Sequence, residues 1–199
     1  MNILFLIYHG FSETSGITKK IKAQVDGLRQ AGHKVYVCTY SILENGHRCR
    51  MIDDEILQDF GSGKLAPMKK RMCYKAVYDF CVQKNVEAVY CRSFHNANPW
   101  TIRLFSRLKK AGIKCGMEIP TYPYDQKYVG FPFFTRLELQ VDKLFRKRLA
   151  STLQRIVTFS SDKEIFGQKT ICISNGISFE KIPMRKPEQN DDNTIHLIG

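Results

Sequence analysis

Short apolar segments of strand length alternate with amphipathic segments of helical periodicity along most of this chain. Strands separated by helices of this size form parallel sheets that carry helices on both faces. The sequence therefore predicts an α/β fold, a Rossmann-like doubly wound parallel sheet. The predicted strands cover residues 3–8, 35–39, 86–91, 113–119, 155–159 and 170–174.

Helical periodicity and end signals place the helices. Gly32 is predicted to end the first helix, and Asn98-Pro99 is typical of a helix start, with Asn as N-cap and Pro as first residue. Another helix is expected after Pro67, and a short one after Asp162. The first helix has one apolar face, formed by Ile17, Ile21, Val25 and Leu28.

The segment between the second and third predicted strands is less regular. Asn45-Gly46 predicts a hairpin turn that leads into a short strand over residues 48–52. Residues 53–67 match no pattern well enough to assign an element.

The longest predicted helix covers residues 135–153 and is rich in basic residues. Its periodicity predicts one buried apolar face. That face consists of Leu137, Val141, Leu144, Phe145 and Leu149.

The last residues predict the start of a second domain. Residues 1–187 contain the predicted sheet and helices, residues 188–193 are a polar linker, and residues 194–199 resemble a first strand. A lone strand cannot bury its apolar side chains. We therefore expect the chain to be truncated at the first strand of a missing C-terminal domain.

Charge and cysteine content limit the function classes. The 31 basic residues exceed the 19 acidic ones, and the excess is concentrated in residues 64–75 and 136–155. Such surfaces suit nucleic acid, anionic lipid or phosphorylated small molecules, or they are solvated helix faces without a partner. Seven scattered cysteines without a C-x-x-C motif predict buried free thiols and no zinc site.

The loop after the first strand is a candidate phosphate site. Ser15 and Gly16 precede the first helix, whose N-terminus offers backbone N–H groups and positive dipole to an anion. The alternative is an ordinary connecting loop. Because this loop lacks G-x-G-x-x-G, a nicotinamide cofactor is disfavoured, and no metal-ligand cluster is predicted.

Further candidates follow later strands at the same expected edge of the sheet. Glu118, Tyr122, Tyr124 and Asp125 form a stretch suited to a sugar, because flat rings stack on pyranoses and carboxylates bind hydroxyls. The alternative is a hydrophobic cap over the end of the sheet. Arg92 directly follows the strand predicted over residues 86–91 at this edge and is a further candidate binding residue.

Several motifs together resemble the N-terminal domain of retaining family 4 glycosyltransferases of the GT-B fold. They are Ser15-Gly16-Ile17, residues 28–35 (similar to L-x-x-x-G-H-x-V), residues 118–123, residues 156–160, and Ile173-Ser174-Asn175-Gly176-Ile177 (similar to I-P-N-G-I/V-D). Each motif is degenerate, but their order and spacing agree with the family over essentially the whole chain.

This resemblance implies a two-domain hexosyltransferase that moves a sugar from a nucleotide diphosphate sugar to a glycan or lipid-linked acceptor in surface polysaccharide synthesis, with retention and no cofactor. Ser15 and Gly16 would lie near the donor phosphates, and Glu118 would be the catalytic candidate beside the acceptor. The acceptor-binding residues would be Arg92, Tyr122, Tyr124 and Asp125. Asn175-Gly176 would form the interdomain turn. Because the main donor-binding residues belong to the second domain, we expect these 199 residues alone to be inactive.

The resemblance and the basic charge together imply a cytoplasmic protein in peripheral contact with anionic membrane, with no nucleic-acid partner. One alternative stays open: a stand-alone basic α/β binding module for glycan, phosphate ligand or nucleic acid that acts with a partner chain.

Overall fold

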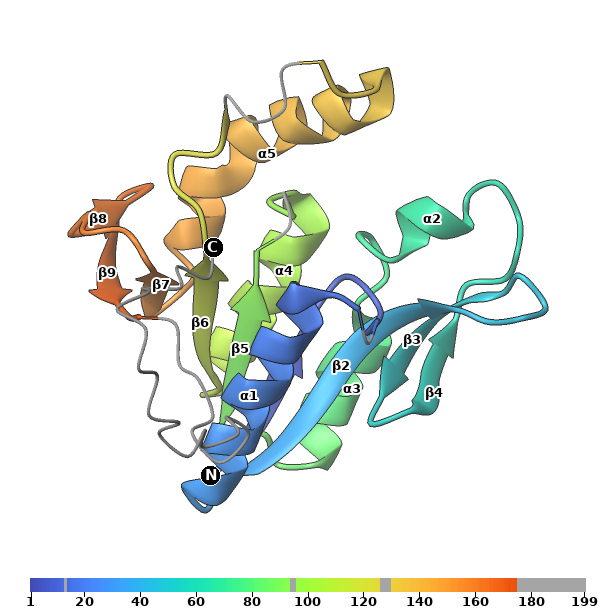
Figure 1. Cartoon of the computed structure of the whole chain (residues 1–199), viewed down its shortest axis with the longest axis horizontal. Coiled ribbons are helices and arrows are strands. Elements are labelled where there is room, and N and C mark those ends of the chain that lie inside the picture. The colour runs from blue at the N-terminus through green and yellow to red at the C-terminus, as the bar shows by residue number, and fades with distance from the viewer. Residues whose placement is uncertain (13, 94–95, 126–129, 175–199) are drawn as a thin grey trace, which may run out of the picture.

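A computed structural model describes residues 1–12, 14–93, 96–125 and 130–174. Within these residues nine strands form one sheet in the order β4-β3-β2-β1-β5-β6-β7-β9-β8, flanked by helices (Figure 1). The strands are β1 (Asn2–Leu6), β2 (Lys34–Ile42), β3 (Arg48–Ile52), β4 (Glu55–Asp59), β5 (Ala88–Arg92), β6 (Lys114–Ile119), β7 (Arg155–Thr158), β8 (Glu164–Ile165) and β9 (Gln168–Cys172). The helices are α1 (Gly16–Gln30), α2 (Ala66–Lys69), α3 (Lys75–Gln83), α4 (Pro99–Lys110) and α5 (Phe133–Ala150).

The centre of the sheet is parallel and its edges are not. β2, β1, β5, β6, β7 and β9 pair in parallel, whereas β3 and β4 at one edge and β8 at the other pair antiparallel. Helices cover both faces, so the predicted doubly wound Rossmann-like α/β fold is confirmed.

Two apolar clusters show which helix covers which face. Side chains of β1 alternate between them, because successive residues of a strand point to opposite faces. Ile3 and Phe5 pack with Ile21 and Val25 of α1. On the other face, Leu4 belongs to a larger cluster with residues of α3, α4 and α5. The residues that these helices contribute include Val77, Cys81, Phe105, Leu108 and Leu149.

Local signals explain several element ends. The Asn98 side chain accepts a hydrogen bond from Thr101 N at 2.9 Å, and Pro99 is the first residue of α4, as predicted. Gly32 follows α1 with a φ of 82°, a conformation that glycine adopts without strain. Gly46, with a φ of 77°, lies in the turn between β2 and β3, which confirms the predicted hairpin.

Two predicted helices need correction, and one unassigned segment contains a strand. The helix expected after Pro67 is two helices, α2 and α3. The short helix expected after Asp162 is instead the strand β8, which forms a hairpin with β9. The unassigned residues 53–67 contain β4, and a register shift at Arg50/Met51 breaks the pattern of its pairing with β3.

The buried face predicted for α5 is also wrong in part. Leu149 is buried, but Leu137 and Leu144 are exposed, and Leu139 and Asp142 lie inside instead. The helix carries apolar residues on two faces, and periodicity alone does not tell which one packs.

The prediction of free thiols is confirmed for all the cysteines, and that of burial for all except Cys73 and Cys172. All seven are free, and five of them are buried. Burial raises the pKa of Cys38 to about 11 and that of Cys91 to about 12, so these thiols stay protonated near neutral pH.

Candidate functional site at the carboxyl edge of the sheet

The strand order reverses between β1 and β5. β1 is followed through α1 by β2 on one side, and β5 pairs with β1 on its other side. In open α/β sheets, ligands bind outside the carboxyl ends of the strands at such a reversal. The segments that follow β1, β5 and β6 are therefore the expected place of a ligand site.

The start of α1 lies at this edge and is held by side-chain hydrogen bonds. Ser15 is the N-cap of α1, and its Oγ accepts from Thr18 N at 3.4 Å. The buried Thr18 hydroxyl in turn accepts from Ser12 N at 3.1 Å. The predicted candidate Ser15 is therefore fixed at a helix N-terminus, where the helix dipole favours an anion.

Gly16 is the first residue of α1, and it faces open space. A Cβ built on Gly16 would meet no atom within 4 Å, whereas one on Gly10 would lie 3.1 Å from Tyr40 O. Packing thus explains a glycine at position 10 and does not explain one at position 16. The open space at Gly16 leaves room for a ligand close to the backbone.

Arg92 and Glu118 lie side by side at the ends of β5 and β6. They are register partners in the parallel pairing of these strands, and Arg92 Nη1 lies 2.6 Å from Glu118 Oε1. Glu118 is fully buried, and the Arg92 side chain is only 10% exposed. The structure thus brings together two of the predicted site residues as a buried ion pair.

The second carboxylate oxygen of Glu118 is also engaged. It accepts hydrogen bonds from the Tyr90 hydroxyl at 2.7 Å and from Gln24 Nε2 at 2.9 Å. We call Gln24, Tyr90, Arg92 and Glu118 the Glu118 cluster. Because its carboxylate is fully buried and accepts from three donors, Glu118 acts on Arg92 in this arrangement.

The side of the Glu118 cluster next to α1 has a positive excess. Lys20 lies one turn before Gln24, and its Nζ is 3.4 Å from the centroid of the Phe159 ring, just after β7. Burial lowers the pKa of Lys20, an effect that the Glu118 charge opposes and the Arg92 charge reinforces. Two cations beside one carboxylate favour an anionic ligand over a neutral one.

The Gln24 side chain carries an unusual acceptor. Its Oε1 is buried and has no hydrogen-bond partner among the described residues. A buried unpaired amide oxygen is costly. A ligand hydroxyl that reached the Glu118 cluster would find an acceptor there.

A separate cluster is formed in part by the segment that follows β6. It contains Tyr122, Tyr124 and Asp125. The Tyr124 hydroxyl donates to Asp142 Oδ2 at 2.7 Å, and Arg146 binds both oxygens of Asp125 at 2.8 and 3.1 Å. Tyr122 packs edge-on against Phe166, with ring centroids 5.5 Å apart.

The space within this second cluster is small. The cavity that Tyr124, Asp142, Arg146 and Phe166 line has a volume of about 10 Å³, which is at most one water molecule. The side chains of this cluster contact one another through ring packing, a hydrogen bond to Asp142 and an ion pair at Asp125, so the cap that the sequence left open as an alternative to a sugar platform is partly polar.

The basic stretch at residues 64–75 is partly engaged in packing. Arg71 pairs with Glu138 of α5 at 2.9 Å, and Lys70 Nζ lies 4.4 Å from the Tyr40 ring centroid. Burial, followed by the charge of Arg71, lowers the pKa of Lys70 to about 8. Part of the positive charge in residues 64–75 therefore takes part in contacts within the folded protein.

Comparison with known proteins adds nothing to these observations. No protein-family model matches the chain, and no curated protein matches it. Within the described residues, no three His, Cys, Asp or Glu side chains gather as metal ligands, and no described helix is long and apolar enough to cross a membrane.

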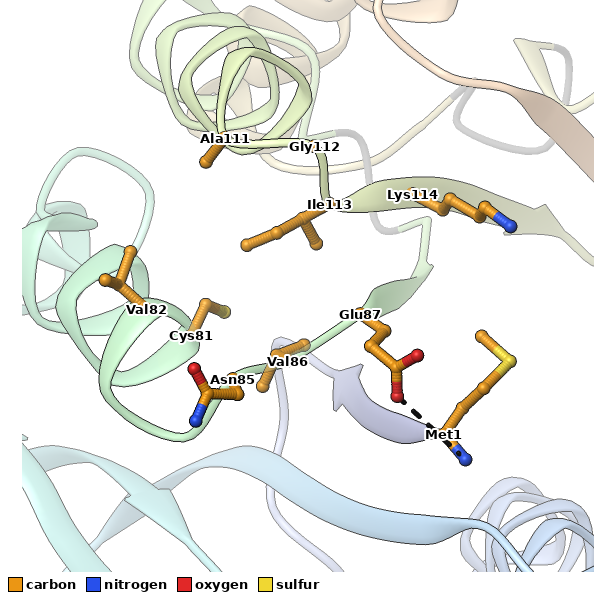
Figure 2. A pocket seen from close by; sticks show the side chains of 10 residues that line it. All are labelled: Met1, Cys81, Val82, Asn85, Val86, Glu87, Ala111, Gly112, Ile113 and Lys114. Carbon is orange, nitrogen blue, oxygen red and sulfur yellow. Dashed lines mark ion pairs between the residues drawn. The ribbon is translucent and has the colours of Figure 1, made fainter.

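A second hollow lies at the opposite, amino-terminal edge of the sheet. Figure 2 shows this pocket of about 500 Å³, with Met1, Glu87 and Lys114 among its lining residues. The Met1 amine lies 4.0 Å from a Glu87 carboxylate oxygen. None of the predicted site residues lines it.

Sequence reasoning identified half of the Glu118 cluster. Arg92 and Glu118 were predicted, while Gln24, Tyr90 and the nearby Lys20 were not. Tyr90 was accessible to prediction, because it stands two residues before Arg92 on the same face of β5. Gln24 and Lys20 belong to α1, and their position beside Glu118 depends on where α1 crosses the sheet. The candidates Asn175 and Gly176 lie outside the described residues.

Proposed function

We propose that this chain is the acceptor-binding half of a retaining GT-B glycosyltransferase of family 4. The reaction is transfer of a hexose from a nucleotide diphosphate sugar to a glycan or lipid-linked acceptor in surface polysaccharide synthesis. The observation that carries the proposal is an open helix N-terminus at Gly16 together with the Glu118 cluster and its neighbouring cation Lys20, at the strand-order reversal of a Rossmann-like sheet.

The proposal gives each part of this edge a role. Ser15 and Gly16 approach the donor diphosphate, where the backbone N–H groups and the helix dipole stabilise negative charge. Arg92 binds the acceptor. The burial of Glu118 and its three donors support a positioning role for this residue, which holds the Arg92 guanidinium in place.

In the proposed reaction the acceptor hydroxyl forms a bond to the anomeric carbon on the face that the diphosphate leaves. The bond between that carbon and the phosphate oxygen breaks, and the leaving phosphate takes the acceptor proton. The configuration at the anomeric carbon is retained. No side chain is required as a base, which is compatible with a Glu118 that is fully buried and already accepts from three donors.

The test is a transfer assay on the protein encoded by the complete reading frame. We would supply nucleotide diphosphate sugars and envelope glycolipids, and identify products by mass spectrometry and anomeric configuration by NMR. Hexose transfer with retention is expected. Absence of transfer from every donor would overturn the proposal, and an inverted product would overturn the retaining assignment.

Gly16→Val tests the proposed donor-phosphate contact. Its matched control is Gly27→Val in the same helix, since a Cβ at either glycine meets nothing within 4 Å. Both variants are expected to fold. Turnover should fall roughly a hundredfold in Gly16→Val, because a displaced donor is misaligned, and stay unchanged in Gly27→Val. Equal turnover in both variants would remove Gly16 from the site.

The proposed setting is the cytoplasm, with peripheral contact at an anionic membrane where a lipid-linked acceptor would be met. The positive net charge of +12 supports this setting.

A further inference from the structure

Helix α5 has a second apolar face that the protein does not bury. Its packed face includes Leu139, Leu149 and Ala150. Phe133, Leu137 and Leu144 fall within about 40° of one another around the helix axis, on the side roughly opposite to that packed face. Helical geometry thus gathers the exposed apolar residues into one stripe.

The exposure of this stripe is high for large apolar side chains. Phe133 is 71% exposed, Phe134 77%, Leu137 50% and Leu144 75%, and Phe131 just before the helix is also exposed. Phe133 and Phe134 lie with ring centroids 5.8 Å apart. Five of the fifteen exposed large apolar residues of the described chain are therefore concentrated in or beside α5, and such concentration marks an interaction surface.

The position of α5 makes this stripe accessible to a large flat partner. Figure 1 shows that the first half of α5 projects beyond the sheet, away from α1 and α3. Phe133 and Phe134 belong to this projecting half.

The charges around the stripe have one sign. Arg136, Lys147 and Arg148 are exposed on α5. Both acidic residues of the helix are engaged elsewhere: Glu138 pairs with Arg71, and the buried Asp142 accepts from Ala97 N and the Tyr124 hydroxyl. The exposed side of α5 therefore combines aromatic and aliphatic side chains with cations.

We propose that this α5 surface (Phe131, Phe133, Phe134, Arg136, Leu137, Leu144, Lys147 and Arg148) binds the surface of an anionic membrane. The apolar side chains enter the boundary between headgroups and acyl chains, and the basic side chains contact lipid phosphates. The inference takes its membrane setting from the proposed function, but its evidence is the composition and exposure of α5.

Charge complementarity favours a membrane over a second copy of the chain. In a two-fold symmetric dimer, the same patch would face itself, which brings its cations (Arg136, Lys147 and Arg148) toward the cations of the other copy. Like charges across an interface oppose association. An anionic bilayer satisfies the cations and the apolar stripe at the same time.

The experiment is co-sedimentation of the 199-residue chain with vesicles of phosphatidylcholine alone or mixed with phosphatidylglycerol. We expect binding to the mixed vesicles at low salt, and weaker binding to phosphatidylcholine. Phe133→Ser with Phe134→Ser should reduce the affinity about tenfold or more. Arg136→Gln with Lys147→Gln should weaken it about fivefold for each charge removed.

Matched controls lie at the other edge of the sheet. Val82→Ser removes an exposed apolar residue, and Lys110→Gln with Lys114→Gln removes two exposed charges; all are expected to bind like wild type. Circular dichroism and thermal unfolding show whether each variant is folded, which is expected because every replaced side chain is exposed.

The proposal would be overturned if the α5 variants bound to vesicles as well as the wild type does. It would also be overturned if the wild type did not sediment with mixed vesicles at low salt. The proposal would also be overturned if the wild-type protein formed a dimer in solution, the phenylalanine variant abolished that dimer, and neither protein bound to vesicles. Because this assay needs no nucleotide sugar, its failure is separable from a failure of the proposed transferase activity.

Discussion

Two carboxylate–arginine pairs lie at or just after the end of β6, and they differ mainly in burial. Glu118 and Arg92 are enclosed in the sheet, with side-chain exposures of 0% and 10%. Asp125 and Arg146 lie between a loop and α5, with exposures of 33% and 21%. The sequence suggested similar ligand-binding roles for Glu118, Arg92 and Asp125, but their surroundings give them different energetics.

This difference in burial determines whether a substitution in each pair changes the stability of the protein as well as its function. Removing one partner of a buried ion pair leaves an uncompensated charge in a medium of low dielectric, whereas water screens an exposed pair. A change at Glu118 therefore alters folding as well as any chemistry. A change at Asp125 mainly loosens the attachment of one loop to α5.

The largest expected effect is that of Glu118→Gln. The amide keeps the shape of the side chain but leaves the Arg92 guanidinium without its carboxylate. We expect the free energy of unfolding to fall by about 3–5 kcal/mol, as measured by urea denaturation.

A double-mutant cycle with Arg92→Met separates the pair from its surroundings. Methionine keeps an apolar stem without the charge, so the double variant should recover part of the loss, with a coupling of about 1 kcal/mol or more. Additive single effects would show that the two side chains do not act as a pair.

Tyr90→Phe is expected to have an intermediate effect. It removes the 2.7 Å hydrogen bond to Glu118 Oε2, while Gln24 still donates to that oxygen. The ring keeps its contact with Phe5, so the cost is about 1 kcal/mol of unfolding free energy.

Tyr36→Phe is the control for this change. The Tyr36 ring also packs against a phenylalanine, Phe80, and its hydroxyl has no hydrogen bond within the described residues. No change in stability is expected there. Equal effects at positions 36 and 90 would mean that the Glu118 cluster does not depend on the tyrosine hydroxyl.

The fold was predictable because its signals are local. Apolar runs, Gly32, Asn45-Gly46 and Asn98-Pro99 each specify an element or its end from a few neighbouring residues. β4 was missed because its pairing with β3 is irregular. The α5 error has another cause: both faces of that helix are apolar, and only packing selects the buried one.

Within the candidate site, the sequence identified only those residues that lie at the end of a single predicted strand. Arg92 and Glu118 could be identified because each stands at the end of an apolar strand. Their contact depends on β5 and β6 being neighbours in register, and the contact with Gln24 depends on where α1 crosses the sheet. These relations connect residues that are 26 and 94 positions apart in the chain, which no local pattern encodes.

The smallest expected effect is that of Asp125→Asn, and it depends on pH. Hydrogen bonds from Arg146 lower the pKa of Asp125 in the folded protein, against an unfolded value of about 3.9. A lowered folded pKa stabilises the protein above the unfolded pKa, and this contribution is lost as the pH falls through the folded pKa. Near neutral pH we expect the variant to lose about 1 kcal/mol or less, because the pair is partly exposed.

Urea denaturation of wild type and Asp125→Asn at about pH 7 and about pH 3 measures this dependence, and the difference between the two proteins should shrink in acid. Asp79→Asn, which breaks the exposed pair with Lys75 on α3, is the control and should have the smaller effect at neutral pH. The contrast between the two pairs would be wrong if Asp125→Asn lowered the free energy of unfolding as much as Glu118→Gln does. It would mean that the loop after β6 is held to α5 as firmly as the sheet holds Glu118, and that burial is not what separates them.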